Sequence, residues 1–428
     1  MIRNITGFRR VFFNLGIRLF VLRHIAALAF MRKGIFRNIF RILGRLEFFL
    51  RRMHENKFVS IDGKTRIGLY IPGMPSNAFR TACNKFTVFG DKLPCTTVLV
   101  SVTSACVFKC PHCYQRHDRG GDVPVGILVD VVKAMQNQGI AFFNIEGGEP
   151  FLTYDRLLAV CSAIDDRSEI WVNSTGFGMD SDKLTELKKR GVTAIMFPLL
   201  FGNRETTDRF MGRKGAWDTV HRGTALCREA GIAVALNMCL SRDQFYNGDF
   251  EACMEEAKRR GAAIIQIIKP KPAGGWLDGG ASRFTDDDLK HARKKVHRYN
   301  QGARYRDYPA ISAQIMEEDA AHFGCTCGGT DRFYLNAKGD VQPCEFLNVS
   351  FGNIAGEEFW AIYRRMRETF RIPGVDWLCE KYAPAIAAIR QEQGIDTLPL
   401  SPELSRQCIA GWERGAPTPL YGKLEGRR

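Results

Sequence analysis

The sequence has 428 residues, of which 45% are hydrophobic and 25% are charged, and it has no low-complexity tract, so a disordered or fibrous chain is excluded. Its 14 cysteines lie in a long chain without a clear export signal, which excludes a small secreted disulfide scaffold and predicts reduced thiols in the cytoplasm. Positions 1–52 hold twelve basic residues and one acidic residue and so supply +11 of the net charge of +15, and the nearly balanced remainder does not predict nucleic-acid binding.

Shifts in composition divide the chain into four predicted regions. A basic, apolar segment covers residues 1–53, and a bridging segment covers residues 54–95. Alternating strand-like and helix-like runs cover residues 96–300. An irregular region rich in cysteine covers residues 301–428.

The first region predicts a basic amphipathic helix, because apolar and basic residues recur at helical spacing on different faces. The apolar stripe comprises Phe36, Ile39, Phe40, Leu43, Leu46 and Leu50, and the basic face comprises Arg37, Arg41, Arg45 and Arg52. Such a helix suits an anionic membrane surface, so we expect peripheral association at the inner face of the membrane. The alternative is that the stripe packs on the protein and the arginines are solvated. The sequence has no run of about 18 uncharged apolar residues, so it does not predict a helix that spans the membrane.

The third region repeats a strand-then-helix pattern. The predicted strands are 97–102, 140–145, 169–173, 193–198, 232–238 and 263–268. The predicted helices include 128–137, 157–164, 181–189, 217–230 and 250–260. Alternation of this kind predicts an α/β fold with parallel strands and right-handed crossovers. Because six units are too few for a full barrel, we expect a partial (β/α)6 TIM-type barrel with its active site at the C-terminal strand ends.

A cysteine motif follows the first predicted strand. Cys106, Cys110 and Cys113 have the spacing C-x3-C-x2-C on this loop. Three thiolates can bind three irons of a cubane cluster and leave the fourth iron open to a small molecule. The alternative is zinc, but structural zinc takes four closed ligands, and His112 is too tightly placed to complete that set comfortably.

The loop resembles the C-x3-C-x-Φ-C signature of the radical S-adenosylmethionine (SAM) superfamily, with His112 where an aromatic residue is usual. The resemblance implies a 4Fe–4S cluster whose open iron is chelated by the amino and carboxylate groups of SAM. It also implies a reductant such as flavodoxin or ferredoxin, whose electron cleaves SAM to methionine and a 5′-deoxyadenosyl radical. That radical abstracts a substrate hydrogen, while the protein binds and orients the reactants.

The end of the second predicted strand resembles the SAM amino-group motif of this family. Gly147, Gly148, Glu149 and Pro150 occupy the matching positions. The glycines would let the backbone approach the ligand, and the carboxylate would accept its ammonium group. A tight strand-to-helix turn is the alternative interpretation.

Two further strand ends offer polar side chains to SAM. Asn173, Ser174 and Thr175 follow the third strand and match positions that bond the ribose hydroxyls in this family, although they could equally cap the next helix. Asn237 on the fifth strand is a further SAM candidate, because a buried asparagine requires a partner.

The last region carries five cysteines around a predicted hairpin with its turn at residues 338–340. This arrangement resembles the SPASM/Twitch extension of radical SAM enzymes, which implies one auxiliary 4Fe–4S cluster. Four ligands are needed, and we expect Cys325, Cys344, Cys379 and Cys408, with Cys327 as the spare. The cysteines interpreted as structural are Cys83, Cys95, Cys161, Cys227, Cys239 and Cys253.

Together these features predict a cytoplasmic, peripherally membrane-bound radical SAM enzyme that functionalises an unactivated C–H bond, with a lipid-like substrate. A SPASM-type peptide maturase is the alternative among enzymes. An iron–sulfur electron-transfer or sensor protein is the alternative of another class, but it leaves the turn at 147–150 and the barrel pattern without a role.

Overall fold

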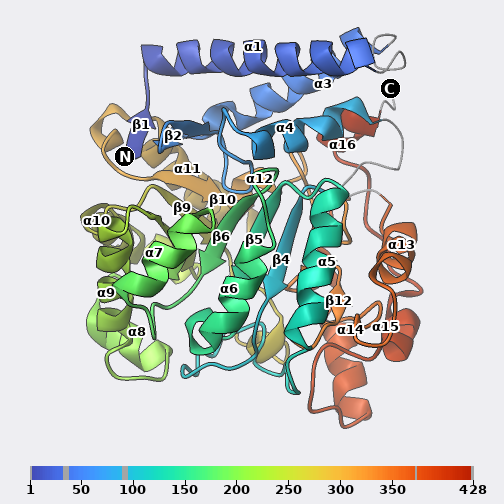
Figure 1. Ribbon diagram of the computed structural model, residues 1–428. Coiled ribbons are helices and arrows are strands. Elements are labelled where there is room, and N and C mark those ends of the chain that lie inside the picture. The colour runs from blue at the N-terminus through green and yellow to red at the C-terminus, as the bar shows by residue number, and fades with distance from the viewer. Residues whose placement is uncertain (1, 32–37, 89–94, 372–373, 426–428) are drawn as a thin grey trace.

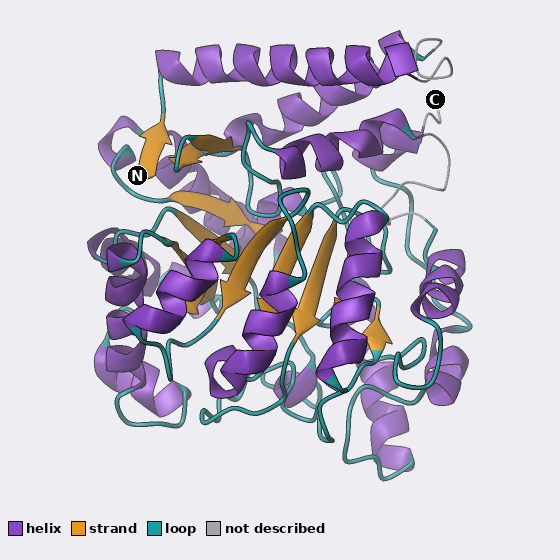
Figure 2. Cartoon of the chain, in the orientation of Figure 1, coloured by secondary structure: helices purple, strands orange, loops and turns teal. Residues whose placement is uncertain are grey.

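The computed structural model describes the chain except residues 1, 32–37, 89–94, 372–373 and 426–428. A helical cap lies over one end of a strongly twisted sheet, further helices surround that sheet, and C-terminal helices lie beside it (Figure 1). Figure 2 shows that the strands run from the cap toward the opposite end of the molecule, where long loops gather. The cap and these loops therefore occupy opposite ends of the barrel.

A nine-stranded sheet forms the centre of the fold, in the order β10-β9-β8-β7-β6-β5-β4-β11-β12. Its strands are β4 (Thr97–Ser101), β5 (Phe142–Glu146), β6 (Glu169–Asn173), β7 (Val192–Pro198), β8 (Ala233–Cys239), β9 (Ile264–Ile268), β10 (Ala310–Ala313), β11 (Arg332–Leu335) and β12 (Val341–Gln342). All neighbours are parallel except β11 and β12, which form the predicted hairpin. The predicted α/β partial barrel is confirmed.

Two parallel strands extend the sheet beyond the six that the sequence predicts. β10 pairs with β9, and β11 pairs with β4 on the other side. Each has only four residues, too short to give a clear periodic pattern. Both come from the region assigned to the C-terminal domain, so that region shares its sheet with the barrel.

Helices cover the outer face of the sheet. They are α5 (Val125–Asn137), α6 (Tyr154–Ser162), α7 (Ser181–Lys189), α8 (Arg204–Phe210), α9 (Ala216–Glu229), α10 (Asp249–Arg259) and α11 (Asp286–Gln301). Strand side chains alternate between the two faces, so Val98 and Val100 pack beneath the helices, whereas Phe142 and Trp171 point into the barrel.

The N-terminal cap consists of β1 (Ile2–Ile5), α1 (Phe8–Met31), α3 (Ile39–Arg52), β2 (Phe58–Ile61), β3 (Lys64–Arg66) and α4 (Asn77–Cys83). Its core is apolar and joins α1, α3 and α4. Ile17, Val21 and Ile25 of α1 are fully buried there, and so are Leu46 and Leu50 of α3. The cap is therefore a packed layer over the N-terminal ends of the barrel strands.

The predicted membrane face on the second half of this region is wrong. Leu46 and Leu50 of the stripe lie in the cap core, and Arg45 of the basic face is only 2% exposed. The Arg45 guanidinium donates to the backbone oxygens of Phe86 at 3.1 Å and Val88 at 2.6 Å. Phe36 and Arg37 lie outside the described residues, while Phe40 is exposed. The packing alternative therefore holds for α3.

Helix α1 differs from the prediction in another way. Over Phe8–Leu28 it is long and apolar enough to cross a membrane by length and composition alone, and it is the one such helix in the described part of the chain. The sequence does not predict a spanning helix, because it has no run of about 18 uncharged apolar residues, and Arg18 lies within this stretch. In the structure, α1 lies along the cap with one face packed into its core.

The bridging segment closes the N-terminal end of the barrel. Arg66 of β3 forms a buried ion pair with Glu169 at the start of β6 and lies 4.6 Å from the centre of the Trp171 ring. Tyr70 enters the barrel, where its hydroxyl accepts a hydrogen bond from Gln266 at 2.8 Å. Trp171 and Tyr70 pack with Phe142 into a barrel floor whose apolar core is bordered by the Arg66–Glu169 ion pair.

The C-terminal region adds α12 (Gln314–Glu317), α13 (Phe359–Thr369), α14 (Leu378–Glu392), α15 (Pro402–Ile409) and α16 (Pro419–Glu425). Helix α14 lies near the C-terminal ends of the barrel strands, whereas α16 returns to α3 in the cap (Figure 1). The chain therefore connects both ends of the barrel after leaving its sheet.

Candidate active site

The loops after β4, β5 and β6 meet at the end of the barrel opposite the cap. The loop from β4 carries Cys106, Cys110 and Cys113, and the turn after β5 carries Glu149. Parallel strands bring their carboxyl ends to one edge, so these loops become neighbours. This is the edge at which the sequence predicted the active site.

The thiols of the β4 loop are neighbours, since those of Cys113 and Cys106 both influence the pKa of Cys110. Cys106 is exposed and the other two are half-buried. Burial, with the neighbouring thiols of Cys113 and Cys106, raises the pKa of Cys110 to about 12. Burial, followed by the Cys106 thiol and the Glu146 carboxylate, raises the pKa of Cys113 to about 11. Three thiols on one loop could hold three irons of one cluster.

Other loops hold the cysteine loop in place. The backbone N–H of Lys109 donates to the Met211 oxygen at 2.9 Å, and the N–H of Gly275 donates to the Cys113 oxygen at 3.0 Å. The N–H of Ser104 donates to the carboxylate of Asp122, also at 2.9 Å. These hydrogen bonds fix the position of the loop that carries the three thiols.

His112 packs as an aromatic residue between the last two cysteines. Its ring centre lies 5.0 Å from that of Phe210 and 5.6 Å from that of Trp276. Burial lowers the pKa of His112 to about 4, so the ring is neutral at physiological pH. This position explains how histidine can replace the usual aromatic residue of the motif.

The turn after β5 touches the cysteine loop directly. The N–H of Gly148 donates to the Thr103 oxygen and the N–H of Glu149 to the Ala105 oxygen, both at 2.7 Å. A side-chain carbon on Gly148 would collide with that Ala105 oxygen, so only glycine fits this approach. Gly147 leads into the turn, and buried Pro150 begins the short helix that follows.

Glu149 joins the β5 turn to the β6 turn. Its carboxylate accepts hydrogen bonds from the Ser174 hydroxyl at 2.6 Å, the Thr175 N–H at 2.8 Å and the Thr175 hydroxyl. It also accepts from the N–H of Phe151 at 3.2 Å. Burial raises the pKa of Glu149, and these hydrogen bonds oppose that rise. Ser174 and Thr175 therefore support Glu149 in this structure.

The remaining SAM candidates point into the barrel. Asn173 donates to Glu146 at 3.0 Å, and its side-chain oxygen is buried without a partner among the described residues. Asn237 donates a hydrogen bond to Gln266 at 2.7 Å, and Gln266 in turn donates one to the Tyr70 hydroxyl on the barrel floor. The barrel interior therefore has hydrogen-bonded polar side chains at the loop end, at Asn173 and Glu146, and also at the floor, at Gln266 and Tyr70.

Glu146 and Tyr114 are residues of this site that the sequence analysis did not identify. Glu146 ends β5 inside the barrel and accepts a hydrogen bond from the Tyr114 hydroxyl, one residue after Cys113. Burial raises the pKa of Glu146 to about 8. The sequence could have indicated Glu146, because an acidic side chain that points inward from a buried strand requires a partner.

A second group of cysteines lines a small cavity beside the barrel. The four are Cys325, Cys327, Cys344 and Cys379, and all are buried. The sulfur atoms of Cys325 and Cys327 are 3.5 Å apart. In the described chain, no three His, Cys, Asp or Glu side chains are close enough to hold a single metal ion. A cubane spreads its thiolate ligands over four different irons, so wider spacing is expected of it.

Basic side chains surround this cysteine cavity. A guanidinium nitrogen of Arg332 lies 3.9 Å from the Cys344 sulfur, and one of Arg414 lies 3.4 Å from the Cys327 sulfur. Lys271 also lines the cavity and pairs with Glu380 at 2.7 Å. Positive charge of this kind would stabilise several thiolates in one buried place.

Cys408 does not line the cavity with the other four cysteines. It lies on α15, half-buried against the apolar core. The expected ligand set named Cys408 and kept Cys327 as the spare, whereas in the structure Cys327 lines the cavity and Cys408 does not. The spacing of the cysteines along the sequence does not indicate which of the late ones the fold brings to the cavity. The cysteines interpreted as structural lie in apolar clusters, namely Cys83, Cys95, Cys161, Cys227, Cys239 and Cys253.

A cleft of about 640 Å³ lies between the loop after β9 and helix α14. Trp276 connects it to the first group through His112, and Lys269 connects it to the second group through Glu380, at 2.8 Å. Its walls come from the loop after β9 and from α14, including Phe284 and Ala387. A cleft of this volume is large enough for an organic substrate.

Comparisons with known proteins identify the superfamily. The model of the radical SAM superfamily matches residues 100–256. The chain is 24% identical to the AdoMet-dependent heme synthase of Nitratidesulfovibrio vulgaris over 69% of this chain and 85% of that protein. It is 30% identical to the Fe-coproporphyrin III synthase of Methanosarcina barkeri, over 62% of this chain and 65% of that one. It is also 22% identical to the PqqA peptide cyclase of Granulibacter bethesdensis, over 66% and 77% respectively.

The fold is also known from solved structures. Streptococcus suis SuiB bound to its precursor peptide SuiA has a TM-score of 0.52 at 14% identity, over 63% of this chain and 64% of that one. At this identity the likeness concerns the fold alone. The enzyme prediction is confirmed over the electron-transfer or sensor alternative. Residues 100–256 therefore form a radical SAM domain, and the chain is an enzyme that uses a 4Fe–4S cluster and S-adenosylmethionine.

Proposed function

We propose that Cys106, Cys110 and Cys113 hold the catalytic 4Fe–4S cluster. The observation that carries this proposal is the position of the cysteine loop at the C-terminal ends of β4 and β5, where its backbone is hydrogen-bonded to the Glu149 turn. When bound, the cluster supplies the electron for reductive cleavage of SAM, and the 5′-deoxyadenosyl radical so formed abstracts a substrate hydrogen. The braced loop and the neutral ring of His112 keep the three thiols in place.

The turns after β5 and β6 are proposed to bind SAM. Gly147 and Gly148 leave space for close approach, Pro150 fixes the turn, and Glu149 offers an acceptor to the ammonium group. Contacts to the nucleoside are proposed for Asn173, Ser174, Thr175 and Asn237. The unpartnered side-chain oxygen of Asn173 supports this assignment, because a buried polar atom without a partner requires one.

An auxiliary 4Fe–4S cluster is proposed for the second cysteine group. Its ligands would be Cys325, Cys327, Cys344 and Cys379, which line one cavity. The three neighbouring basic side chains support this assignment, because they offset the charge of the thiolates. The cleft between the loop after β9 and α14 is the proposed substrate site.

The proposed reaction is functionalisation of an unactivated C–H bond of a substrate in this cleft, with flavodoxin or ferredoxin as the reductant. A peptide substrate is the second candidate, supported by the similarity to the PqqA peptide cyclase. In the cell, we place the protein in the cytoplasm at an anionic membrane surface. The support for that placement is the concentration of positive charge in residues 1–52.

Iron and sulfide content tests the two-cluster assignment. Wild-type protein reconstituted without oxygen should hold about eight irons per chain, and replacing Cys106, Cys110 and Cys113 by Ala should leave about four. Unchanged iron in the triple variant would contradict the catalytic cluster site. A triple variant free of iron would contradict the auxiliary site.

A further inference from the structure

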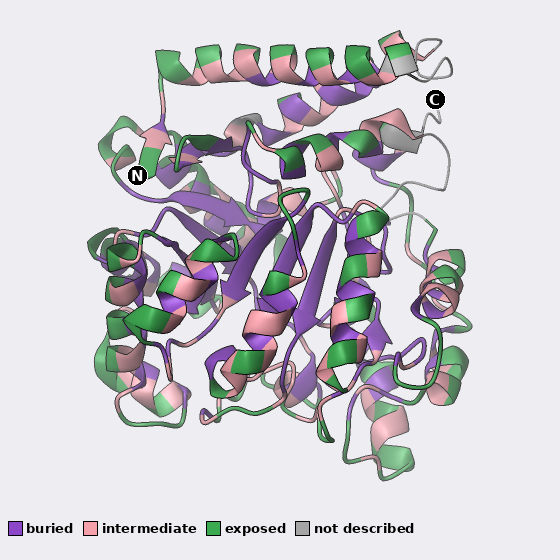
Figure 3. Ribbon diagram, in the orientation of Figure 1, coloured by how far each residue is buried: buried purple, intermediate pink, exposed green. Residues whose placement is uncertain are grey.

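The outward face of α1 is a continuous apolar stripe. Its members are Phe8, Val11, Phe12, Leu15, Leu19 and Leu22, with exposed fractions of 87%, 65%, 72%, 55%, 48% and 39%. Phe8, Phe12, Leu15, Leu19 and Leu22 follow one another in steps of three or four residues and so form one row along the helix, and Val11 widens it. Figure 3 shows much of α1 as exposed, in contrast to the buried strands below the cap. An exposed apolar row of this length marks an interaction surface.

The opposite face of α1 is anchored in the protein. Ile17, Val21 and Ile25 are almost completely buried among apolar residues of α3 and α4. The helix therefore lies flat on the cap, with apolar residues both beneath it and above it. A helix held in this way presents its outer row along its whole length.

Positive charge borders the stripe. Arg3, Arg9 and Arg23 are exposed. The single acidic residue of positions 1–52 is Glu47, and its carboxylate is engaged by Arg18 and Arg51, both at 2.9 Å. An apolar row flanked by arginines complements an anionic bilayer, into which the row inserts while the arginines reach the headgroups.

The reaction site lies at the other end of the barrel. Helices α1 and α3 cover the ends where the strands begin, whereas the cysteine loop follows the ends where they finish (Figure 1). Arg66, Trp171 and Phe142 close the barrel between them. A membrane at α1 would therefore face away from the cluster loop.

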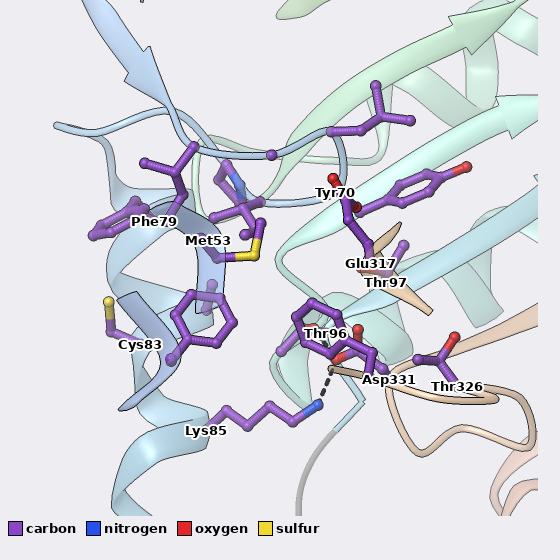
Figure 4. A pocket seen from close by; sticks show the side chains of 18 of the residues that line it. Met53, Tyr70, Phe79, Cys83, Lys85, Thr96, Thr97, Glu317, Thr326 and Asp331 are labelled. Atoms are coloured by element: carbon purple, nitrogen blue, oxygen red, sulfur yellow. Dashed lines mark hydrogen bonds and ion pairs between the residues drawn. The ribbon is translucent and has the colours of Figure 1, made fainter. Parts of the chain in front are cut away.

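A cavity under the cap does not join the two ends. It has a volume of about 110 Å³, with Met53 and Phe79 on the cap side and Tyr70 and Thr97 on the barrel side (Figure 4). Tyr70 also belongs to the barrel floor, where it packs on Phe142 with ring centres 5.7 Å apart. A lipid that reached this cavity would still be separated from the reaction site by that floor.

We propose that the outer row of α1 inserts into the headgroup region of an anionic membrane, so that the catalytic site faces the aqueous phase. This proposal rests on the membrane placement given under the proposed function and adds the docking surface and the orientation. It follows that the substrate reaches the cleft from water. The lipid-like substrate expected from the N-terminal charge loses its main support.

Vesicle binding tests the docking surface. Full-length reconstituted protein should bind phosphatidylcholine vesicles that contain phosphatidylglycerol, more weakly at high salt, and should bind poorly to phosphatidylcholine alone. The double variant Leu15→Glu/Leu19→Glu should lower the partition coefficient by at least about tenfold, because two inserted leucines are lost. The control variant Asn137→Glu/Ala225→Glu carries the same added charge on exposed positions of α5 and α9 and should bind like wild type.

Tryptophan quenching by brominated lipid tests the orientation. The native tryptophans Trp171, Trp217, Trp276, Trp360, Trp377 and Trp412 all lie outside the cap. Wild-type fluorescence should therefore be the same on brominated and ordinary anionic vesicles, whereas the variant Phe12→Trp should be quenched. Quenching of the native tryptophans without quenching at position 12 would overturn the orientation while leaving membrane binding intact.

Other results would overturn the proposal at separate points. Failure of wild type to bind anionic vesicles would refute both the membrane placement and the orientation. Retention in the membrane after alkaline carbonate extraction would show that α1 spans the bilayer. A dimer in solution that the Leu15→Glu/Leu19→Glu variant dissociates would show that a second copy covers the row. SAM cleavage measured in the same samples separates these failures from a failure of the proposed chemistry.

Discussion

The N–H of Glu149 donates to the backbone oxygen of Ala105 at 2.7 Å, so the SAM turn and the cysteine loop are joined by their backbones. Gly148 makes this approach possible, because it has no side chain to collide with Ala105. We predict that Gly148→Ala lowers iron incorporation and SAM affinity together, measured by iron analysis and equilibrium dialysis. The control is Gly126→Ala on α5, where a side-chain carbon meets no atom within 4 Å. Normal iron content and SAM affinity in Gly148→Ala would show that the two loops need not touch.

Glu149→Gln should weaken SAM binding by about 10- to 100-fold, the usual effect of losing a charged hydrogen bond. The amide keeps the shape of the carboxylate, so the cluster should still assemble. Isothermal titration with SAM, together with the absorbance of the cluster, measures the two properties separately. Wild-type affinity in this variant would leave Glu149 with the purely local role of joining the β5 and β6 turns.

Cys327→Ser and Cys408→Ser form a matched pair for the auxiliary site. Cys327 lines the cavity with three other cysteines, whereas Cys408 lies on α15 outside it. In a background without the catalytic cysteines, Cys327→Ser should lower the remaining iron, about four per chain, and Cys408→Ser should not. The opposite pattern would restore the ligand set expected from the sequence.

The positions of Cys327 and Cys408 relative to the second cavity could not be predicted from the sequence. The spacing of Cys106, Cys110 and Cys113 is local, so the loop could be identified directly. The cysteines that line the second cavity come from the segment before the hairpin, from its end and from α14, and they meet only because α14 folds back. The number of residues between the cysteines does not indicate that α14 folds back toward the hairpin.

The two N-terminal helices show a second limit. The apolar stripe on α3 is recognisable in the sequence because the opposite face of the helix is polar. A difference in polarity between two faces indicates that the apolar face is covered, but it does not indicate whether protein or membrane covers it. Helix α1 has apolar residues on both faces, one for the cap core and one exposed, so it shows little contrast and was not identified as an interface. Only packing distinguishes the two faces.

Arg66→Met should destabilise the protein by about 3–5 kcal/mol, because it leaves the buried Glu169 carboxylate without its cationic partner. Anaerobic urea unfolding measures the change. The double variant Arg66→Met/Glu169→Gln should recover part of the loss, because the neutral Gln leaves no unpaired charge and its single amide oxygen can still accept from Trp171. A loss below about 1 kcal/mol in the single variant would mean that the ion pair does not close the barrel floor.

His112→Phe should retain the cluster, and His112→Ala should lower its occupancy. The neutral ring packs between Phe210 and Trp276, so an aromatic residue can replace it whereas alanine leaves a cavity. Iron content and the cluster absorbance after reconstitution provide the measurement. Loss of metal in His112→Phe would instead indicate that the imidazole is a ligand, as in the zinc interpretation.

The central claim is that the three cysteines of the β4 loop support reductive cleavage of SAM, and the most direct test is formation of 5′-deoxyadenosine. Reconstituted wild-type protein, reduced with dithionite under anaerobic conditions and given SAM, should form 5′-deoxyadenosine. Cys113→Ala should form none above the protein-free background, whereas Cys408→Ser should match wild type. Equal 5′-deoxyadenosine formation by Cys113→Ala and wild type, or none by wild type with its full iron content, would contradict this account.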